Sequence, residues 1–326
     1  MFDIINKLTH AFGPSGNEKM VADLIRDMLK DKVDEIKTDN LGNLICIKKG
    51  SGKKIMLAAH MDEIGIIISY IDKNGFLRFS NVGGLDPFVI LGKRVIFENG
   101  TVGVIWYEEN IDDIKNLKIE KMYIDIAAKS KEDAEKLVNV GDMAVFEEGT
   151  ILQNGRIISK VMDNRIGCAV LVQAALNQPE TENEIYYVFT TQEEVGLRGA
   201  GPAAYGIMPD MALAVDVTDT GDTPECKPMT VKLGDGPAIK IKDRSVIAHP
   251  EVKDRLIKCA LENNIPHQFE ILSQGGTDAG SIHTTAGGIP SGGVAIPTRN
   301  VHNSAEIVDI KDVENAVKLI EAFIRQ

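Results

Sequence analysis

From about residue 160 onward, apolar runs of strand length alternate with segments of helical periodicity, and this alternation limits the fold more than any other feature of the sequence. Near-continuous apolar runs are typical of strands that are buried on both faces of a sheet, and strands that alternate with helices predict an α/β fold. The expected strands are residues 185–191, 211–217, 237–242, 267–272 and 292–296, and the expected helices are residues 164–177, 250–264 and 310–325. We therefore predict an α/β sheet with helices on both faces.

The first 63 residues continue this pattern, whereas the middle of the chain does not. Two helices are expected at residues 2–11 and 17–30, and two strands at residues 43–47 and 54–59. Between residues 64 and 158, short strand-like runs alternate with glycine turns such as Asn74-Gly75, which are typical of β-hairpins. We interpret residues 1–63 and 159–326 as one domain, and residues 64–158 as a small β-rich domain that is inserted into it.

Composition and charge argue against several classes of function. The chain has 36 basic and 48 acidic side chains among 326 residues, a net charge of −12, so a nucleic-acid partner is not expected. The four cysteines are scattered without a CxxC pair, which predicts neither a disulfide framework nor a thiolate metal site. The amphipathic N-terminus is unlike a signal peptide, and no apolar stretch approaches the ~20 residues that span a membrane. We expect a cytoplasmic protein that has no membrane partner.

Side chains that can bind a metal ion stand at four expected strand ends and one helix start. They are His60, Asp163, Glu194, Asp216 and His302. In open α/β sheets, ligands bind beyond the carboxyl ends of the strands, so we expect these residues to lie at one edge of the sheet. Taken singly, each has a simpler explanation: a surface histidine, a helix N-cap at Asp163, or a solvated acidic turn at Glu193 and Glu194.

As a set, the five residues favour a metal centre. Nitrogen and oxygen ligands without thiolate suit zinc, cobalt or manganese. Five ligands exceed the three that one catalytic zinc ion usually takes, and they match two ions that share a bridging carboxylate. Asp62 can orient the His60 ring. Of the adjacent Glu193 and Glu194, one can bind metal while its neighbour reaches a metal-bound water.

Six short motifs, in this order along the chain, resemble the tetrahedral-aminopeptidase family, which includes glutamyl and deblocking aminopeptidases and some members labelled endoglucanase. They are His60-Met-Asp62-Glu-Ile-Gly, Met162-Asp163-Asn-Arg165, Gln192-Glu193-Glu194-Val-Gly, Asp216-Val-Thr, Gly275-Gly-Thr-Asp278-Ala and Val301-His302. The resemblance runs from Phe12-Gly-Pro-Ser-Gly16 to the final helix. It implies a catalytic domain of the di-zinc exopeptidase type, with a mixed sheet covered by helices. It also implies that the β-rich insertion serves dimerisation and that dimers assemble into a dodecamer.

The resemblance further implies a role for each candidate residue. It implies two divalent ions, with zinc or cobalt first and manganese as an alternative. Asp163 is implied as the bridging ligand, His60 and Asp216 as the ligands of one ion, and Glu194 and His302 as the ligands of the other. Glu193 is implied as the general base towards a water between the ions, and Asp62 as the support of His60. The activity that follows is the removal of single N-terminal residues from short peptides.

Two other functions are compatible with parts of the sequence. A glycoside hydrolase of the endoglucanase type would use two carboxylates and no metal, so that it would survive a chelator. A non-enzymatic assembly module would release no product from aminoacyl substrates. The sequence does not indicate which N-terminal residue is preferred. Several basic side chains could bind an acidic residue of the substrate: Arg198, Lys240, Lys242 and Arg244.

Overall fold

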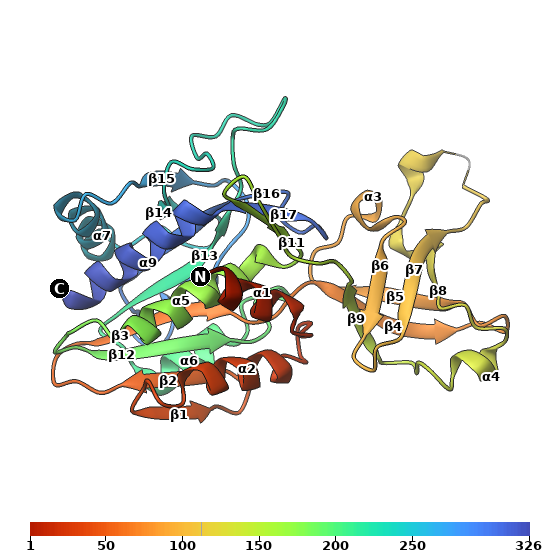
Figure 1. Cartoon of the computed structure of the whole chain (residues 1–326), viewed down its shortest axis with the longest axis horizontal. Helices are drawn as coiled ribbons and strands as arrows, with labels where there is room; N and C mark the ends of the chain where they lie inside the picture. Colours follow the sequence, from red (N-terminus) through yellow and green to blue (C-terminus); the bar gives the residue numbers. More distant parts are fainter. Residues whose placement is uncertain (112) are drawn as a thin grey trace.

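The computed structural model describes residues 1–111 and 113–326, and it contains a large α/β body beside a small β-barrel (Figure 1). An 11-stranded sheet forms the centre of the body. Its main path runs through β1 (Glu35–Thr38), β2 (Leu44–Lys48), β12 (Glu184–Thr190), β3 (Lys54–His60), β13 (Met211–Thr218), β16 (Ser291–Arg299), β17 (Glu306–Asp309), β11 (Arg156–Ser159) and β10 (Ile151–Gln153). Off this path, β14 (Ala238–Lys242) pairs with β16 and with β15 (Gln268–Ile271).

The directions of the strands make this sheet mixed. The central strands β12, β3, β13 and β16 are parallel neighbours, whereas β2 and β17 are antiparallel to β12 and β16. Every residue of β13 is buried, as its continuous apolar run predicts for a strand covered on both faces. The predicted α/β class with a mixed, helix-covered sheet is confirmed.

Helices cover both faces of the sheet. One core contains side chains of α1 (Phe2–His10), α2 (Lys19–Leu29), α5 (Met162–Asn177), α7 (Pro250–Glu262) and α9 (Ile310–Arg325). The opposite core contains α6 (Ala200–Ile207) and Ile282 of α8 (Asp278–Ile282). Alternation along β3 divides the two cores, since Ile55 and Leu57 enter the first while Met56 and Ala58 enter the second. No helix in the described ranges is both long and apolar enough to cross a bilayer.

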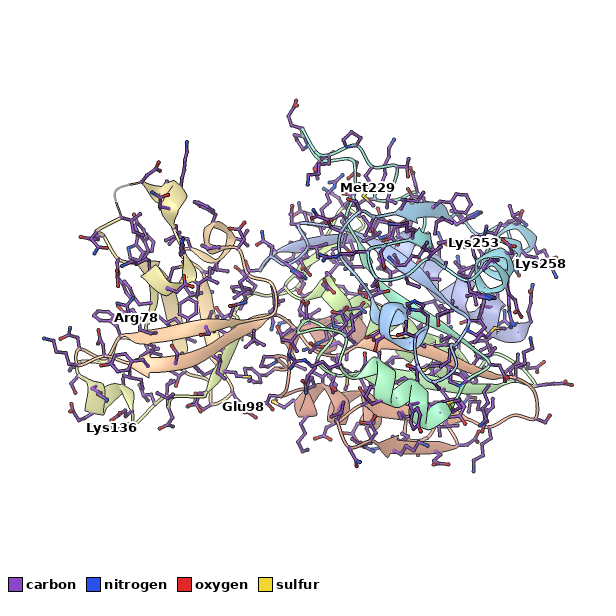
Figure 2. The ribbon with its side chains drawn as sticks, turned by 180° about the vertical axis from the view of Figure 1, so that it is seen from behind. Arg78, Glu98, Lys136, Met229, Lys253 and Lys258 are labelled. Atoms are coloured by element: carbon purple, nitrogen blue, oxygen red, sulfur yellow. The ribbon has the colours of Figure 1, made fainter. Side chains whose placement is uncertain are left out.

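The smaller unit is a closed barrel with its own core. Its strands, in order around the barrel, are β4 (Gly65–Ile71), β5 (Leu77–Val82), β8 (Met122–Asp125), β7 (Val102–Tyr107), β6 (Arg94–Phe97) and β9 (Met143–Phe146). Outside these strands lie the short helices α3 (Pro87–Ile90) and α4 (Lys131–Ala134) and the 3₁₀ turns Ile114–Asn116 and Ile119–Lys121. Closure pairs β4 with β9 and so leaves the sheet without a free edge. Figure 2 marks the barrel by Arg78, Glu98 and Lys136, and Glu98 accepts a hydrogen bond of 3.1 Å from Asn17 of the body.

Several parts of the architecture differ from the sequence-based expectation, and strands β1 and β17 lie where no strand was expected. Helices α6 and α8 lie where no helix was expected, because the glycines and the proline in Ala200–Ile207 indicate a turn when only local propensity is considered. The strands of the barrel end at Phe146, and the hairpin of β10 and β11 pairs through β17 with the large sheet, although its residues fall largely within the expected insertion. Its Asn154-Gly155 turn has the same sequence signature as the hairpins of the barrel.

Candidate metal centre

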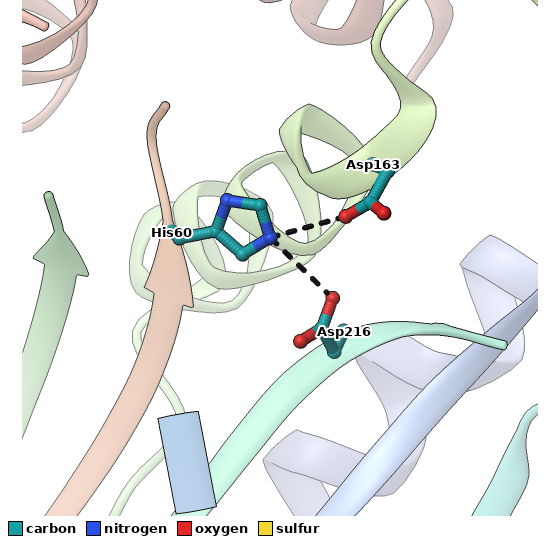
Figure 3. Close-up of side chains that lie close together, drawn as sticks. All are labelled: His60, Asp163 and Asp216. Atoms are coloured by element: carbon teal, nitrogen blue, oxygen red, sulfur yellow. Dashed lines mark hydrogen bonds and ion pairs between the residues drawn. The ribbon is translucent and has the colours of Figure 1, made fainter. Parts of the chain in front are cut away.

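The parallel central strands bring the first group of candidate ligands to one edge of the sheet. His60 is the last residue of β3, and Asp216 lies near the carboxyl end of the neighbouring β13. The Nε2 atom of His60 lies 3.0 Å from Oδ1 of Asp163 and 3.7 Å from Oδ1 of Asp216, as drawn in Figure 3. One ligand atom from each of these residues lies within 4.8 Å of the others, so the three side chains can hold one ion.

A second group shares Asp163 with the first. The Nε2 atom of His302 lies 3.4 Å from Oδ2 of Asp163 and 3.3 Å from Oε2 of Glu194. Asp163 therefore presents one carboxylate oxygen to each histidine. One ligand atom from each of Asp163, Glu194 and His302 lies within 4.8 Å of the others, so these three side chains can also hold an ion. The structure brings all five predicted ligands into two adjoining sets that share a single carboxylate. Oxygen and imidazole donors in this number suit two divalent ions such as zinc.

The two supporting residues predicted from the sequence lie beside these groups. Oε2 of Glu193 is 3.9 Å from Nε2 of His60. Asp62 is fully buried, and its Oδ1 lies 3.4 Å from Nδ1 of His60, on the side of the ring that faces away from Asp163. Asp62 also accepts hydrogen bonds from the backbone N–H groups of Glu193 (3.0 Å) and Glu194 (3.1 Å), and from the Ser15 hydroxyl at 2.6 Å. It therefore fixes the position of three other site residues at once.

Burial dominates the electrostatics of the carboxylates. It raises the pKa of Glu193 and Asp216 well above the usual values and raises that of Glu194, and the neighbouring carboxylates add to each shift. Burial also opposes ionisation of Asp163, but the hydrogen bonds with His302 and His60 outweigh it and hold its pKa below the usual value. A divalent cation bound here would add positive charge to this cluster of buried carboxylates.

The histidines respond in the opposite direction. Burial alone would lower the pKa of His60, but the charges of Glu193 and Asp163 outweigh it and raise the pKa well above the usual value. For His302 burial is again outweighed, here by Asp163 and Glu194, and the pKa rises to about 12. Both rings thus lie in a strongly negative environment, which favours any cation placed between them.

The start of α5 has an unusual backbone that presents Asp163 to the site. Asp163 and Asn164 have non-helical φ/ψ angles, and the peptide bond between them is cis. The simpler explanation of Asp163 as an N-cap is wrong, because the side-chain oxygen that accepts from a first-turn N–H belongs to Asn164, whose Oδ1 accepts from Gly167 at 3.0 Å. Asn164 also donates to the Val215 carbonyl at 2.8 Å, which ties this turn to β13 beside Asp216.

Buried Arg165 fixes the same turn to the N-terminal segment. Its guanidinium donates to the carbonyls of Met61 (2.7 Å), Leu8 (2.6 Å) and Ala11 (2.8 Å) and pairs with Glu63 at 3.1 Å. The first helix, the end of β3 and the start of α5 are therefore connected through one side chain.

Several further residues border the site without having been predicted. Asp278 at the start of α8 accepts a 2.5 Å hydrogen bond from Thr190, and burial raises its pKa to about 6. Glu306 at the start of β17 is buried beside Asp163 and His302. Gly83 and Gly84 of the barrel also reach the centre, since a Cβ atom on either would lie within 3.4 Å of Glu194 or His302. Only the Gly275–Ala279 motif gave a sequence signal, through its Asp278.

The cations considered for an acidic substrate differ in their surroundings. Lys240 is 1% exposed, and its Nζ lies 2.7 Å from Glu270 and 3.2 Å from Asp243. Two carboxylates therefore already neutralise Lys240. The other three, Arg198, Lys242 and Arg244, are exposed.

Comparison with known proteins assigns this arrangement to a family. Residues 42–319 match the M42 glutamyl aminopeptidase family. A relative from Acetivibrio thermocellus, named "Putative aminopeptidase", is 59% identical over 98% of this chain and 97% of its own. The TET aminopeptidase of the marine sediment archaeon Thaumarchaeota archaeon SCGC AB-539-E09 superposes with a TM-score of 0.96 at 38% identity, covering 100% of this chain and 96% of that one.

A second solved structure, of the Pyrococcus horikoshii TET1 peptidase, is described as assembling into a tetrahedron or a large octahedral shell. It has a TM-score of 0.90 and 33% identity, and the match covers 100% of this chain and 99% of that one. These matches span both the α/β body and the barrel. The chain belongs to the M42 glutamyl aminopeptidase family.

Proposed function

We propose that this protein is a metal-dependent aminopeptidase that removes N-terminal residues from short peptides by means of two divalent ions. The observation that carries the proposal is the position of Asp163, whose two carboxylate oxygens face His60 and His302 separately. Asp216 would complete the set around His60, and Glu194 the set around His302. Zinc and cobalt suit these donors best, and manganese is an alternative.

Glu193 has the position of a general base in this proposal. When bound, the two ions would supply Lewis acidity, which polarises a peptide carbonyl and lowers the pKa of a nearby water. The Glu193 carboxylate would take the proton of that water and deliver it to the leaving amine. Asp62 holds the Glu193 backbone through its N–H group and so restricts where that carboxylate can lie. Proton transfer of this kind typically contributes about 10²–10⁴-fold to the rate.

The substitution Glu193→Gln tests this role, because it keeps the size of the side chain and removes the base. We expect turnover of aminoacyl-anilides to fall about 10²–10⁴-fold, while metal analysis still finds two ions per chain. Exposed Glu148 provides the control Glu148→Gln, which should keep full turnover. Near-normal turnover of the Glu193 variant would remove this residue from the base role.

The same preparation separates the alternative functions. A panel of glutamyl, lysyl and leucyl anilides, assayed with zinc, cobalt and manganese in turn, measures the preference for the N-terminal residue. Activity on a soluble glucan that survives a chelator would favour the glycoside hydrolase. Absence of release from every aminoacyl substrate would favour the assembly module.

We also propose that the protein is a homo-oligomer in which the barrel forms contacts between subunits, with dimers assembling into a dodecamer. Three apolar side chains on one face of β7, Val102, Val104 and Trp106, are 41–44% exposed. Alternate residues of a strand point to the same side, so they form a continuous apolar stripe. A stripe of this kind on a closed barrel is typical of a protein–protein contact. The shells described for the Pyrococcus horikoshii relative support the larger assembly.

A further inference from the structure

Glu306 connects two of the proposed metal ligands through their backbones. The carboxylate lies at the start of β17 and is 2% exposed. Its Oε1 accepts a hydrogen bond from the backbone N–H of His302 at 2.8 Å, and its Oε2 accepts one from the backbone N–H of Asp163 at 3.0 Å. A single side chain thus fixes the backbones of two residues that are distant in sequence.

These two ligands have few other constraints on their backbones. His302 lies in the loop between β16 and β17, its side chain is 40% exposed, and its φ of 61° is in the left-handed region. Asp163 has non-helical angles at the start of α5. A non-glycine residue in the left-handed region, such as His302, keeps that conformation only when surrounding contacts hold it there. The hydrogen bonds to Glu306 are contacts of this kind.

The chemistry of this position requires a carboxylate. Both backbone partners are N–H donors, so the side chain between them must present two acceptor oxygens. A glutamine would offer one oxygen and one NH₂ group, and the NH₂ group would face a donor. In the described part of the chain Glu306 forms no ion pair, because nearby Lys160 is paired with Glu63 at 2.7 Å. The two amide groups are therefore the direct hydrogen-bond partners of its two buried oxygens.

Asp62 makes the same kind of hydrogen bonds beside the other histidine of the centre, His60. It accepts from the backbone N–H groups of Glu193 and Glu194, and like Glu306 it is buried. The centre is thus enclosed by two buried carboxylates that each hold two backbone amides.

We propose that Glu306 is a positioning residue that sets the distance between Asp163 and His302 and thereby the affinity for the ion held by Asp163, Glu194 and His302. This inference rests on the proposed two-ion function. The other ion depends less on Glu306, because His60 and Asp216 belong to buried strands. Asp163, which both ions share, keeps its second anchor through the hydrogen bond from Asn164 to Val215.

The test is a metal titration of the full-length Glu306→Gln variant against wild type. Zinc is titrated in competition with a chromophoric chelator, and cobalt is titrated in parallel while its visible absorption spectrum is recorded. We expect one ion to bind with wild-type affinity and the other to be weakened about 10- to 100-fold, the usual effect of removing an outer hydrogen-bond partner. With one equivalent of cobalt, the variant should have the same visible spectrum as wild type. Binding of the second cobalt ion by the variant should require an excess of metal over protein.

A matched control comes from Asp312, a fully buried carboxylate on α9. It accepts from the backbone N–H groups of Gly234 (2.7 Å) and Gly236 (2.8 Å), so Asp312→Asn removes the same kind of interaction at a site that contains none of the proposed ligands. The Asp312 variant should bind both ions as wild type does. If Glu306→Gln does not fold, Glu306→Asp keeps both acceptor oxygens at a shorter reach, and the same weakening of one ion is expected.

Three results would overturn the inference. Equal affinity of wild type and the folded Glu306 variant for both ions would exclude the positioning role. Equal weakening in the Asp312 control would show that loss of stability alone reduces metal binding. A wild-type protein that binds fewer than two ions would refute the two-ion function itself, and the role of Glu306 with it.

Discussion

A methyl group added at Gly84 should weaken the ion on the His302 side while leaving the fold intact. Gly84 lies in the barrel between β5 and α3, and a Cβ atom there would stand 3.1 Å from Nδ1 and 3.3 Å from Cε1 of His302. The φ angle of Gly84 is outside the left-handed region, so alanine causes no backbone strain there. The effect of Gly84→Ala is therefore a steric one on the imidazole ring.

The size of this effect follows from the distances. Ordinary van der Waals contacts between carbon atoms lie at about 3.5–4.0 Å, so the ring must shift by several tenths of an ångström. His302 is the partly exposed member of its group, so its ring will move before the barrel does. Metal–ligand distances tolerate only about ±0.2 Å. We therefore expect the affinity for this ion to fall about 10- to 100-fold, the range found for disturbed outer contacts of metal sites.

Competitive zinc titration of Gly84→Ala and of Gly149→Ala checks this expectation. Gly149 also has φ outside the left-handed region, and its Cβ would meet nothing within 4 Å. Both variants should unfold at the wild-type temperature, and only Gly84→Ala should lose affinity for one ion. If the two variants bind both ions equally, the barrel loop does not confine His302 and the steric argument is refuted.

Two further predictions concern the pH dependence of stability and the assembly. Hydrogen bonds from Arg299 (3.0 and 2.6 Å) lower the pKa of Asp222 to about 2, below its unfolded value, so this pair should stabilise the fold above about pH 4 and lose its effect as the pH falls towards 2. Asp222→Asn should lower the free energy of unfolding by about 1–3 kcal/mol near neutral pH. Urea titrations between pH 6 and 2 should show this difference in unfolding free energy between variant and wild type shrinking as the pH falls. A difference that does not depend on pH would contradict the pairing. Trp106→Glu places a charge on the apolar stripe of β7 and should reduce the mass measured by analytical ultracentrifugation, whereas Tyr205→Glu, at an exposed aromatic on α6, should not. An unchanged mass of the Trp106 variant would exclude this face as a subunit contact.

The sequence predicted those parts of the fold that depend on long apolar runs. Strands β3, β12, β13 and β16 were expected because each is an uninterrupted apolar segment, and burial on both faces of a sheet requires such a segment. The hairpin of β10 and β11 shows the limit of this signal. Its exposed strand β10 and its Asn-Gly turn carry no information on which sheet it joins, since the pairing partner β17 is distant in sequence.

The same distinction explains which residues of the site could be predicted. The five candidate ligands lie near or just beyond the carboxyl ends of strands, or at the start of a helix. The side chain itself performs the proposed function, so its chemical type is visible in the sequence. Gly84 and Glu306 act on partners elsewhere in the chain, one by the absence of a side chain and the other by binding backbone amides. Every residue except proline has a backbone N–H, so a partner of this kind leaves no pattern.

Asp62 was predicted for a reason that covers only part of its role. Its position two residues after His60 suggested that it orients the imidazole, whereas it also holds the amides of Glu193 and Glu194. Glu306 follows His302 by four residues and makes the corresponding bonds to His302 and Asp163. A carboxylate shortly after each histidine therefore links that histidine to ligands from another part of the chain. Asp62 thus reaches both sets, since Glu194 belongs with His302, whereas the amide partners of Glu306 are His302 and the shared Asp163. Substituting Glu306 should therefore disturb the ion beside His302 more than the other ion, and the metal titration of Glu306→Gln measures that asymmetry.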